Sequence, residues 1–309
     1  PKYYIAESED DIREIKQRLY ADQRELRETS PGTVPSVNTT YVASDIETAG
    51  FNHRVDDVLC YGVSSNPARV YIIPEHLALS DASRELLEEE SFSFVWHNGK
   101  FDVKFMRYRK IKARVEHDTM LMSYVQNENR GIHDLDQVAS DALGAPPHKH
   151  VLDKYLPNKK TSYRAVPRKL LHRYLAFDVS KTLGIFFQFY GKVKNDAAND
   201  MAYQDLYIPA SETLARVEMN GIKVNRSQVM KNAKEYRIKL REIRQALNEL
   251  TVKKYKREYN PGSWQQMQEL LYGHLGLRPL NTSTDEDTLK EIEAELRDRH
   301  IVVPELKLL

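Results

Sequence analysis

The spacing of apolar residues predicts a strand and a helix at the start of the chain, then a strand-rich stretch, and then a long helical part. A strand over 3–5 is followed by a helix whose apolar positions recur every three or four residues as far as Leu26. Turn residues fill 30–36, and after them the period becomes two. Strands are predicted at 40–47, 58–64 and 70–74. Their short connections favour an antiparallel meander.

Helices and strands alternate after this meander. The pattern predicts helices over 80–89, 100–108 and from 118, with strands at 92–96 and 115–116 between them. Such an order is typical of one mixed sheet with helices packed on it, which is an α/β fold. A long helix is predicted from Pro167 to Lys194, with its proline near the first turn.

The chain beyond this helix is predicted to be helical throughout. The small polar stretch 195–200 is predicted to be a linker, which gives domains 1–195 and 196–309. Residues 229–258 form the longest periodic helix and carry ten Lys or Arg against four Glu. This charge fits either contact with a nucleic acid backbone or an ordinary solvated surface.

Composition indicates a soluble, charge-rich globular protein. The 309 residues include 46 Lys or Arg and 45 Asp or Glu, and the mean hydropathy is −0.62. Apolar runs such as 183–189 are far shorter than the roughly 20 residues of a membrane helix, and 1–9 lacks the apolar core of a signal peptide. The single cysteine, Cys60, allows no internal disulfide. We therefore expect a cytoplasmic protein with no membrane partner and no thiolate metal cluster.

Two acids, Asp45 and Glu47, stand near the end of a predicted strand. Because strand side chains alternate, both point to one face, beside Tyr41 and Ala43. If helices cover this face, burying two carboxylates there costs free energy unless a proton or a cation neutralises them. A hard divalent metal such as Mg²⁺ suits this environment. Taken alone, the pair fits the water-exposed end of a strand equally well.

Further acids follow on predicted helices. Asp102 lies about one turn into the helix after the strand 92–96, near the carboxyl edge of the sheet, a place that the helix dipole also favours for an acid. Tyr174 and Asp178 lie four residues apart in the long helix, so that a phenol and a carboxylate share one face. A hydrogen-bonded Tyr–Asp pair in the core would show the same spacing.

These acids form three ordered patterns: Asp45-x-Glu47, Asn98-x-x-x-Asp102 and Tyr174-x-x-x-Asp178. They resemble the three exonuclease motifs of the DEDD superfamily in its tyrosine subclass. The segment 118–124, Asp-Thr-Met-Leu-Met-Ser-Tyr, also resembles the proofreading domains of the DNA polymerase I family. The resemblance covers about residues 40–195 and implies a ribonuclease H-like fold with a mixed five-stranded sheet.

The C-terminal part resembles the same polymerases. Residues 209–225 resemble the stretch that leads into the polymerase domain of family A enzymes, and 260–263, 265–277 and 283–289 resemble their thumb subdomain. The resemblance therefore implies a smaller all-α, thumb-like domain over 196–309. The polymerase catalytic motifs are not found in the sequence, so this polypeptide is not expected to synthesise DNA. It would be a fragment or a split subunit, with palm and fingers continuing after Leu309.

The resemblance implies 3'-5' exonuclease activity that removes nucleotides from DNA ends. The acids implied to hold two divalent cations, Mg²⁺ or Mn²⁺, are Asp45, Glu47, Asp102 and Asp178. Tyr174 and Glu47 would orient the attacking water. The implied partners are a single-stranded DNA 3' end and primer–template DNA. Asp118 precedes Thr119 at a predicted helix start, so we expect it to cap that helix rather than bind metal.

Six residues are candidates for contact with nucleic acid: Phe51, Asn98, Lys159, Lys160, Arg164 and Arg168. Phe51 would wedge against the terminal base, or it would be a loop or core aromatic. Asn98 would contact the terminal nucleotide or cap the next helix. The four basic residues belong to the basic stretch 148–173, which would draw a single strand towards the metals or form a solvated loop.

Two alternatives to a proofreading exonuclease remain open. Ribonuclease D shares the tyrosine motif, so a related 3'-5' exoribonuclease fits the same acids, although the thumb-like segment argues against it. An inactive DNA-binding scaffold would keep the fold without the reaction. The presence of all four acids and the tyrosine argues against a decayed site.

Overall fold

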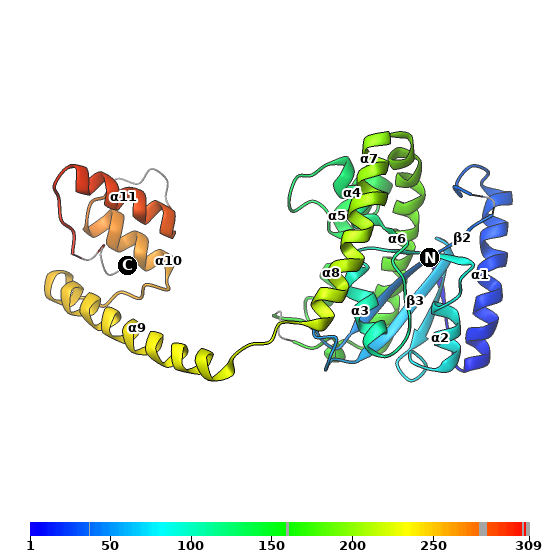
Figure 1. The fold of residues 1–309 in the computed structure, drawn as a ribbon, viewed down its shortest axis with the longest axis horizontal. Coiled ribbons are helices and arrows are strands. Elements are labelled where there is room, and N and C mark those ends of the chain that lie inside the picture. Colours follow the sequence, from blue (N-terminus) through cyan, green and yellow to red (C-terminus); the bar gives the residue numbers. More distant parts are fainter. Residues whose placement is uncertain (37, 159–160, 278–282, 305, 307–309) are drawn as a thin grey trace. The chain divides into compact units, whose positions relative to one another are not determined.

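The computed structural model describes residues 1–309 except 37, 159–160, 278–282, 305 and 307–309. The chain forms two compact units, residues 1–221 and 222–309, which are described in turn (Figure 1). Among the described residues, no helix is both long enough and apolar enough to cross a membrane.

A mixed six-stranded sheet in the order β1-β4-β3-β2-β5-β6 forms the centre of the first unit. The strands are β1 Lys2–Ile5, β2 Thr40–Thr48, β3 Val58–Asn66, β4 Arg69–Pro74, β5 Phe92–Trp96 and β6 His117–Asp118. β2, β3 and β4 form the antiparallel meander, and β1, β5 and β6 add in parallel. The α/β prediction is confirmed. The sheet has one strand more than the five expected, because β1 pairs with the free edge of β4.

Helices cover both faces of this sheet. In chain order they are α1 Glu9–Thr29, α2 Asp81–Leu87, α3 Lys100–Tyr108, α4 Thr119–Gln126, α5 Leu135–Leu143, η1 Lys149–Leu152, η2 Tyr163–Ala165, α6 Arg168–Asn195, α7 Ala197–Met201, η3 Ala202–Tyr207 and α8 Ile208–Asn220. Val42 and Ile46 of β2 pack with α1, α2 and α3, whereas Tyr41 and Ala43 pack with α6. The alternation predicted for β2 therefore separates two cores, and it turns the acids towards α6.

Helix α6 approaches the sheet closely at Gly62 of β3. A Cβ atom at this position would lie 2.8 Å from Val179 Cγ2 and 3.3 Å from Leu175 Cγ, both in α6. Gly62 is paired with Asp45 in the β2–β3 register. The missing side chain thus lets the helix that carries Asp178 lie directly against the acidic strand.

Replacing Gly62 with alanine is expected to lower the free energy of unfolding by about 1–3 kcal/mol, because the added methyl group overpacks this contact. Denaturant unfolding of the full chain measures the change. The matched control is Gly191→Ala in α6 itself. Apart from the neighbouring backbone of the helix, no atom of the described residues lies within 4 Å of the methyl group added there. There alanine is expected to stabilise by up to about 1 kcal/mol. Equal effects at both sites would contradict the close approach.

The first unit extends beyond the boundary expected after residue 195. The predicted linker 195–200 is wrong, because Asp196 caps a helix, α7, by accepting from the Ala198 and Asn199 amides. Farther on, Tyr203 is fully buried and its hydroxyl oxygen accepts from the Asp118 amide at 2.8 Å. Glu212 of α8 accepts two hydrogen bonds of 2.7 Å from Arg107 of α3. These contacts join 196–221 to the α/β unit.

The second unit is all-helical in its described part. It contains α9 Arg226–Tyr255, α10 Trp264–Gln268, η4 Glu269–His274 and α11 Glu286–Asp298. Helix α9 ends where Lys256 adopts a left-handed conformation, with φ 59°. Its C-terminal half packs on α10 and η4 through Leu247, Met267 and Leu270. The predicted helix over 229–258 is confirmed to within three residues at each end.

Candidate active site

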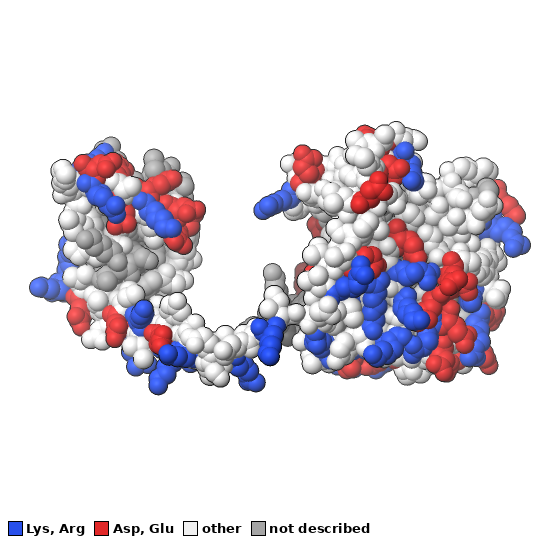
Figure 2. Space-filling view, viewed as in Figure 1, with Lys and Arg blue, Asp and Glu red and all other residues white. Residues whose placement is uncertain are grey.

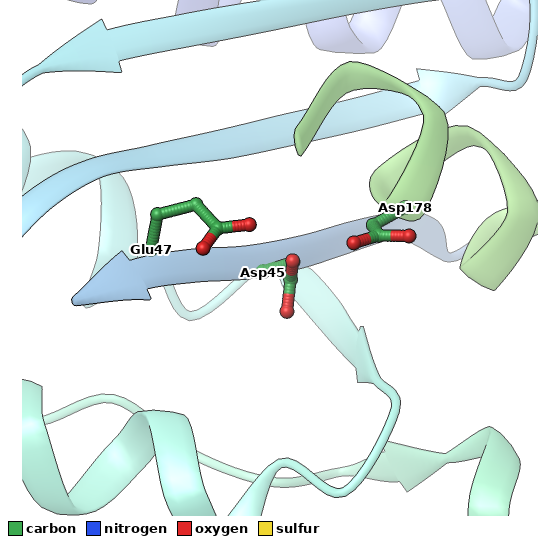
Figure 3. A group of neighbouring side chains, drawn as sticks. All are labelled: Asp45, Glu47 and Asp178. Carbon is green, nitrogen blue, oxygen red and sulfur yellow. The ribbon is translucent and has the colours of Figure 1, made fainter. Parts of the chain in front are cut away.

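Three acids from β2 and α6 meet in one place. One carboxylate oxygen from each of Asp45, Glu47 and Asp178 lies within 4.8 Å of those of the other two (Figure 3). Glu47 and Asp178 are each only 6% exposed. The alternative of a water-exposed strand end is therefore wrong for Glu47. Three acidic side chains are concentrated at the interface between the acidic strand and α6.

Asp102 reaches the same cavity from the other layer of the fold. It lies in the first turn of α3, is 3% exposed, and its Oδ1 accepts a hydrogen bond of 3.1 Å from the Ile46 amide. That amide lies between Asp45 and Glu47 in β2. Because β5 runs parallel to β2, the helix after β5 begins at the same end of the sheet at which the acidic pair lies. This hydrogen bond holds the Asp102 carboxylate against β2, the strand that carries Asp45 and Glu47.

Asp118 fixes the turn from which α3 starts. Its Oδ1 accepts from the Met120 and Leu121 amides at 2.9 and 3.3 Å, which confirms the predicted helix cap. Its carboxylate also accepts from the amides of Asn98 and Gly99, at 3.1 and 2.9 Å. Asn98 has φ 62°, and no side chain among the described residues caps α3, so the capping alternative for Asn98 is wrong.

A cavity of about 620 Å³ surrounds the acids. All four predicted acids line it, together with Tyr174, Phe51, Asn98 and Arg164. Sequence reasoning overlooked two further lining residues, His97 and Tyr163. Tyr163 lies in η2, a three-residue helix without any periodic pattern, so no sequence signal singles it out. The cavity therefore joins β2, α3, α6 and two irregular segments.

Burial and mutual repulsion dominate the electrostatics of this cavity. Burial raises the pKa of Asp45 well above its usual range, and the charges of Asp102, Asp178 and Glu47 raise it further. The pKa of Glu47 is raised for the same reasons, against a small opposing effect of Lys149. Burial also raises the pKa of Asp102. A cluster of this kind favours any ligand that brings positive charge.

The tyrosines of the cavity remain neutral at physiological pH. Burial, together with the charges of Asp178 and Glu47, raises the pKa of the Tyr174 phenol. The pKa of Tyr163 is raised to about 12 by burial and by Glu47, Asp178 and Asp45. Both hydroxyl groups can therefore donate a hydrogen bond to a ligand in the cavity.

The donor atoms fit divalent cations. Carboxylate oxygens are the ligands that Mg²⁺ and Mn²⁺ prefer. Asp178 Oδ1 is buried and has no aligned hydrogen bond among the residues that the structure describes. A cation bound to the carboxylates would offset the repulsion among the acids. The metal-binding and catalytic roles of the four acids stay predictions.

The aromatic candidate for nucleic acid contact lies at the rim of the cavity. Phe51 is 71% exposed, and its ring meets Phe101 edge-on with the centroids 6.4 Å apart. The alternative of a core aromatic is therefore wrong. Phe51 and Asn98 both line the cavity, so either can touch a ligand within it.

The basic candidates are partly neutralised. Arg164 Nη2 lies 2.5 Å from Asp57 Oδ2 and 2.7 Å from Glu75 Oε1, and Arg168 Nη2 lies 2.8 Å from Glu75 Oε2. Figure 2 likewise shows acidic and basic side chains interspersed on the visible face of the first unit. Lys159 and Lys160 lie outside the described residues. Attraction of a single strand by these four residues stays a prediction.

Comparisons with known proteins agree with this arrangement. A family model described as 3'-5' exonuclease, of the DNA polymerase A type, matches residues 18–194. The chain is 27% identical over 247 residues to the DNA polymerase of Escherichia phage T5, covering 72% of this chain and 29% of that protein. It is 22% identical over 301 residues to DNA polymerase I of Bacillus subtilis, covering 90% and 31%. The chain thus spans about three tenths of the length of these relatives.

A solved structure supports the fold. The POL domain of Pol1 from M. smegmatis, in complex with DNA primer-template and dNTP, matches with a TM-score of 0.61 and 16% identity, over 93% of this chain and 45% of that one. The matched family region covers more than half of the 309 residues and contains the three predicted motifs. The chain therefore belongs to the 3'-5' exonuclease family of the DNA polymerase A type.

Proposed function

We propose that this chain hydrolyses DNA from its 3' end, as the proofreading part of a family A DNA polymerase. The observation that supports this most is the meeting of Asp45, Glu47 and Asp178 within 4.8 Å in a cavity that Asp102 also lines. In this proposal residues 1–221 are the exonuclease unit, and 222–309 open a polymerase domain as its thumb-like part. Primer–template DNA and a following palm and fingers segment are its partners.

The four acids hold two divalent cations, Mg²⁺ or Mn²⁺, in this proposal. Bound cations would neutralise charge on the scissile phosphate and make a nucleophile of water. The protein supplies the geometry: Asp45 and Glu47 project from a rigid strand, Asp178 comes from α6, and Asp102 is tied to the Ile46 amide. Phe51 and Asn98 contact the terminal nucleotide at the cavity rim.

Tyr174 and Glu47 orient the attacking water. The Tyr174 phenol stays protonated, because burial and the nearby acids raise its pKa, so it acts as a hydrogen-bond donor rather than as a base. Glu47, ionised when cations are bound, accepts a hydrogen bond from the same water.

The test is degradation of labelled oligonucleotides by the full chain. With Mg²⁺, a 5'-labelled single strand of DNA is expected to shorten stepwise from its 3' end, and EDTA is expected to stop the reaction. An RNA strand of the same sequence tests the ribonuclease D-like alternative, for which RNA would be degraded faster than DNA. A chain that binds DNA without shortening it would be the scaffold instead, and the proposed function would be wrong.

Replacing Tyr174 with phenylalanine is expected to slow cleavage by about 100-fold, because water loses one of its orienting partners. Single-turnover rates at saturating Mg²⁺ measure this effect. Tyr236→Phe, at a residue of α9 that is 68% exposed, is the control and should cleave like the native chain. Mn²⁺ affinity should be unchanged in both variants, since neither removes a carboxylate. Cleavage by Tyr174→Phe at the native rate would exclude the orienting role.

A further inference from the structure

His148 does not line the cavity, yet it contacts two residues that do. Its Nε2 lies 3.0 Å from Asp178 Oδ1. Its ring stacks on the ring of Tyr174, with centroids 4.8 Å apart and planes 27° from parallel. Tyr174 and Asp178 are the two residues of the third motif, so one side chain touches both members of this motif.

The other ring nitrogen of His148, Nδ1, contacts a buried charged pair, Asp136 and Lys181. Asp136 Oδ1 lies 2.8 Å from His148 Nδ1, and Asp136 Oδ2 accepts from the amides of His148 and Lys149, each at 3.1 Å. Lys181 Nζ lies 2.6 Å from Asp136 Oδ1 and 2.7 Å from His148 Nδ1. The three side chains are only 7–15% exposed. The loop that carries His148 is thus anchored to α5 through Asp136 and to α6 through Lys181.

This environment places a proton on Nε2 of His148. A bare nitrogen lone pair facing an ionised carboxylate oxygen at 3.0 Å would be repelled, whereas an N–H at the same place is attracted. Nδ1 lies 2.8 Å from Asp136 Oδ1 and 2.7 Å from Lys181 Nζ, so it either donates to Asp136 or accepts from Lys181, and Nε2 carries a proton in both cases. Nε2 and Asp178 Oδ1 lie 3.0 Å apart but do not meet the angular criteria of a hydrogen bond within the described part of the chain.

We propose that His148 is a positioning residue that sets the orientation of Asp178 and Tyr174 for cation binding and for the reaction. The N–H at Nε2 engages one oxygen of Asp178 and so directs the carboxylate, and the ring face fixes the Tyr174 phenol. The inference rests on the proposed function. Groups that orient a metal-binding side chain in this way typically change metal affinity by 10- to 100-fold.

Two substitutions separate the donor from the ring. His148→Phe keeps an aromatic ring beside Tyr174 and removes the donor, whereas His148→Gln keeps an amide N–H near the place of Nε2. The matched control is His150→Phe, because His150 is exposed and lies in the same segment. Mn²⁺ binding to the full chain, measured by calorimetry without DNA, is the main readout. Thermal unfolding and the single-turnover cleavage rate accompany it.

His148→Phe is expected to bind Mn²⁺ at least about tenfold more weakly than the native chain, while His148→Gln and His150→Phe bind like it. A purely structural role would lower the melting temperature of His148→Phe without this selective loss and its rescue by glutamine. If the phenylalanine variant does not fold, His148→Ala serves as the donor-free partner of His148→Gln, with the same tenfold difference expected.

The outcomes distinguish this inference from the proposed function. Native-like Mn²⁺ affinity in the donor-free variant, in a chain that binds Mn²⁺ and cleaves DNA, would overturn the role of His148 and leave the function standing. Equal losses in the phenylalanine and glutamine variants would also overturn the donor role. A native chain that neither binds Mn²⁺ nor cleaves DNA would contradict the proposed function and this inference together.

Discussion

Replacing Asp178 with asparagine is expected to slow 3'-end cleavage by at least about 1000-fold, which corresponds to about 4 kcal/mol of lost transition-state stabilisation. Asparagine has nearly the same shape but lacks the negative charge that a cation requires. The fold should persist, because removing one of several buried like charges relieves repulsion with Asp45 and Glu47. Single-turnover cleavage of labelled DNA at saturating Mg²⁺ measures the rate.

Asp141→Asn is the matched control for this substitution. Asp141 is an exposed acid of α5, and its carboxylate accepts hydrogen bonds from Gln137, also in α5. The control should cleave at the native rate. Asp102→Asn should behave like Asp178→Asn, although Asp102 lies outside the group of three close oxygens. A loss of less than tenfold in either catalytic-site variant would show that the cavity does not carry the reaction.

Regular periodicity predicted the parts of the site that lie on regular elements. The period of two turned Asp45 and Glu47 to one face, and the packing of Tyr41 and Ala43 against α6 agrees with that side. Helices α3 and α6 were predicted to within one residue of their observed ends. In these segments local backbone geometry alone decides which side chains share a face, so sequence spacing is sufficient.

Long-range contacts explain what periodicity could not predict. The bond between Asp102 and the Ile46 amide joins residues 56 positions apart, and it depends on the parallel register of β5 with β2. The extension of the first unit to residue 221 depends on buried Tyr203 and on the Arg107–Glu212 pair, which joins residues 105 positions apart. His148 likewise reaches Asp178 from an irregular loop. None of these contacts between distant residues produces a periodic pattern in the sequence from which it could be predicted.

In the absence of divalent cations, the acids of the site are expected to contribute a decrease in the free energy of unfolding as the pH rises above about 4. The native pKa values of Asp45, Glu47 and Asp102 are raised above the value of about 4 that acids have in an unfolded chain. Between the unfolded and the native pKa, the native state therefore holds more protons than the unfolded state. The contribution of these three acids to stability is then greatest at low pH and is lost as the pH rises through their native pKa values.

Mg²⁺ is expected to reverse this trend, because it replaces the protons as the neutralising charge. At about 100 times its dissociation constant it should add about 2.7 kcal/mol to the free energy of unfolding, and the gain should shrink as protons compete at low pH. Denaturant unfolding with EDTA or Mg²⁺ across this pH range measures both effects.

Asp45→Asn isolates the contribution of the site from that of other titrating groups. With one acid removed, the metal-free decrease in stability with pH should be smaller, and Mg²⁺ should stabilise the variant much less. The Asp141→Asn control should follow the native chain in both respects. If Mg²⁺ stabilised Asp45→Asn as strongly as the native chain, the ions would bind elsewhere, because a site of buried acids cannot lose a charge without losing affinity for a divalent cation.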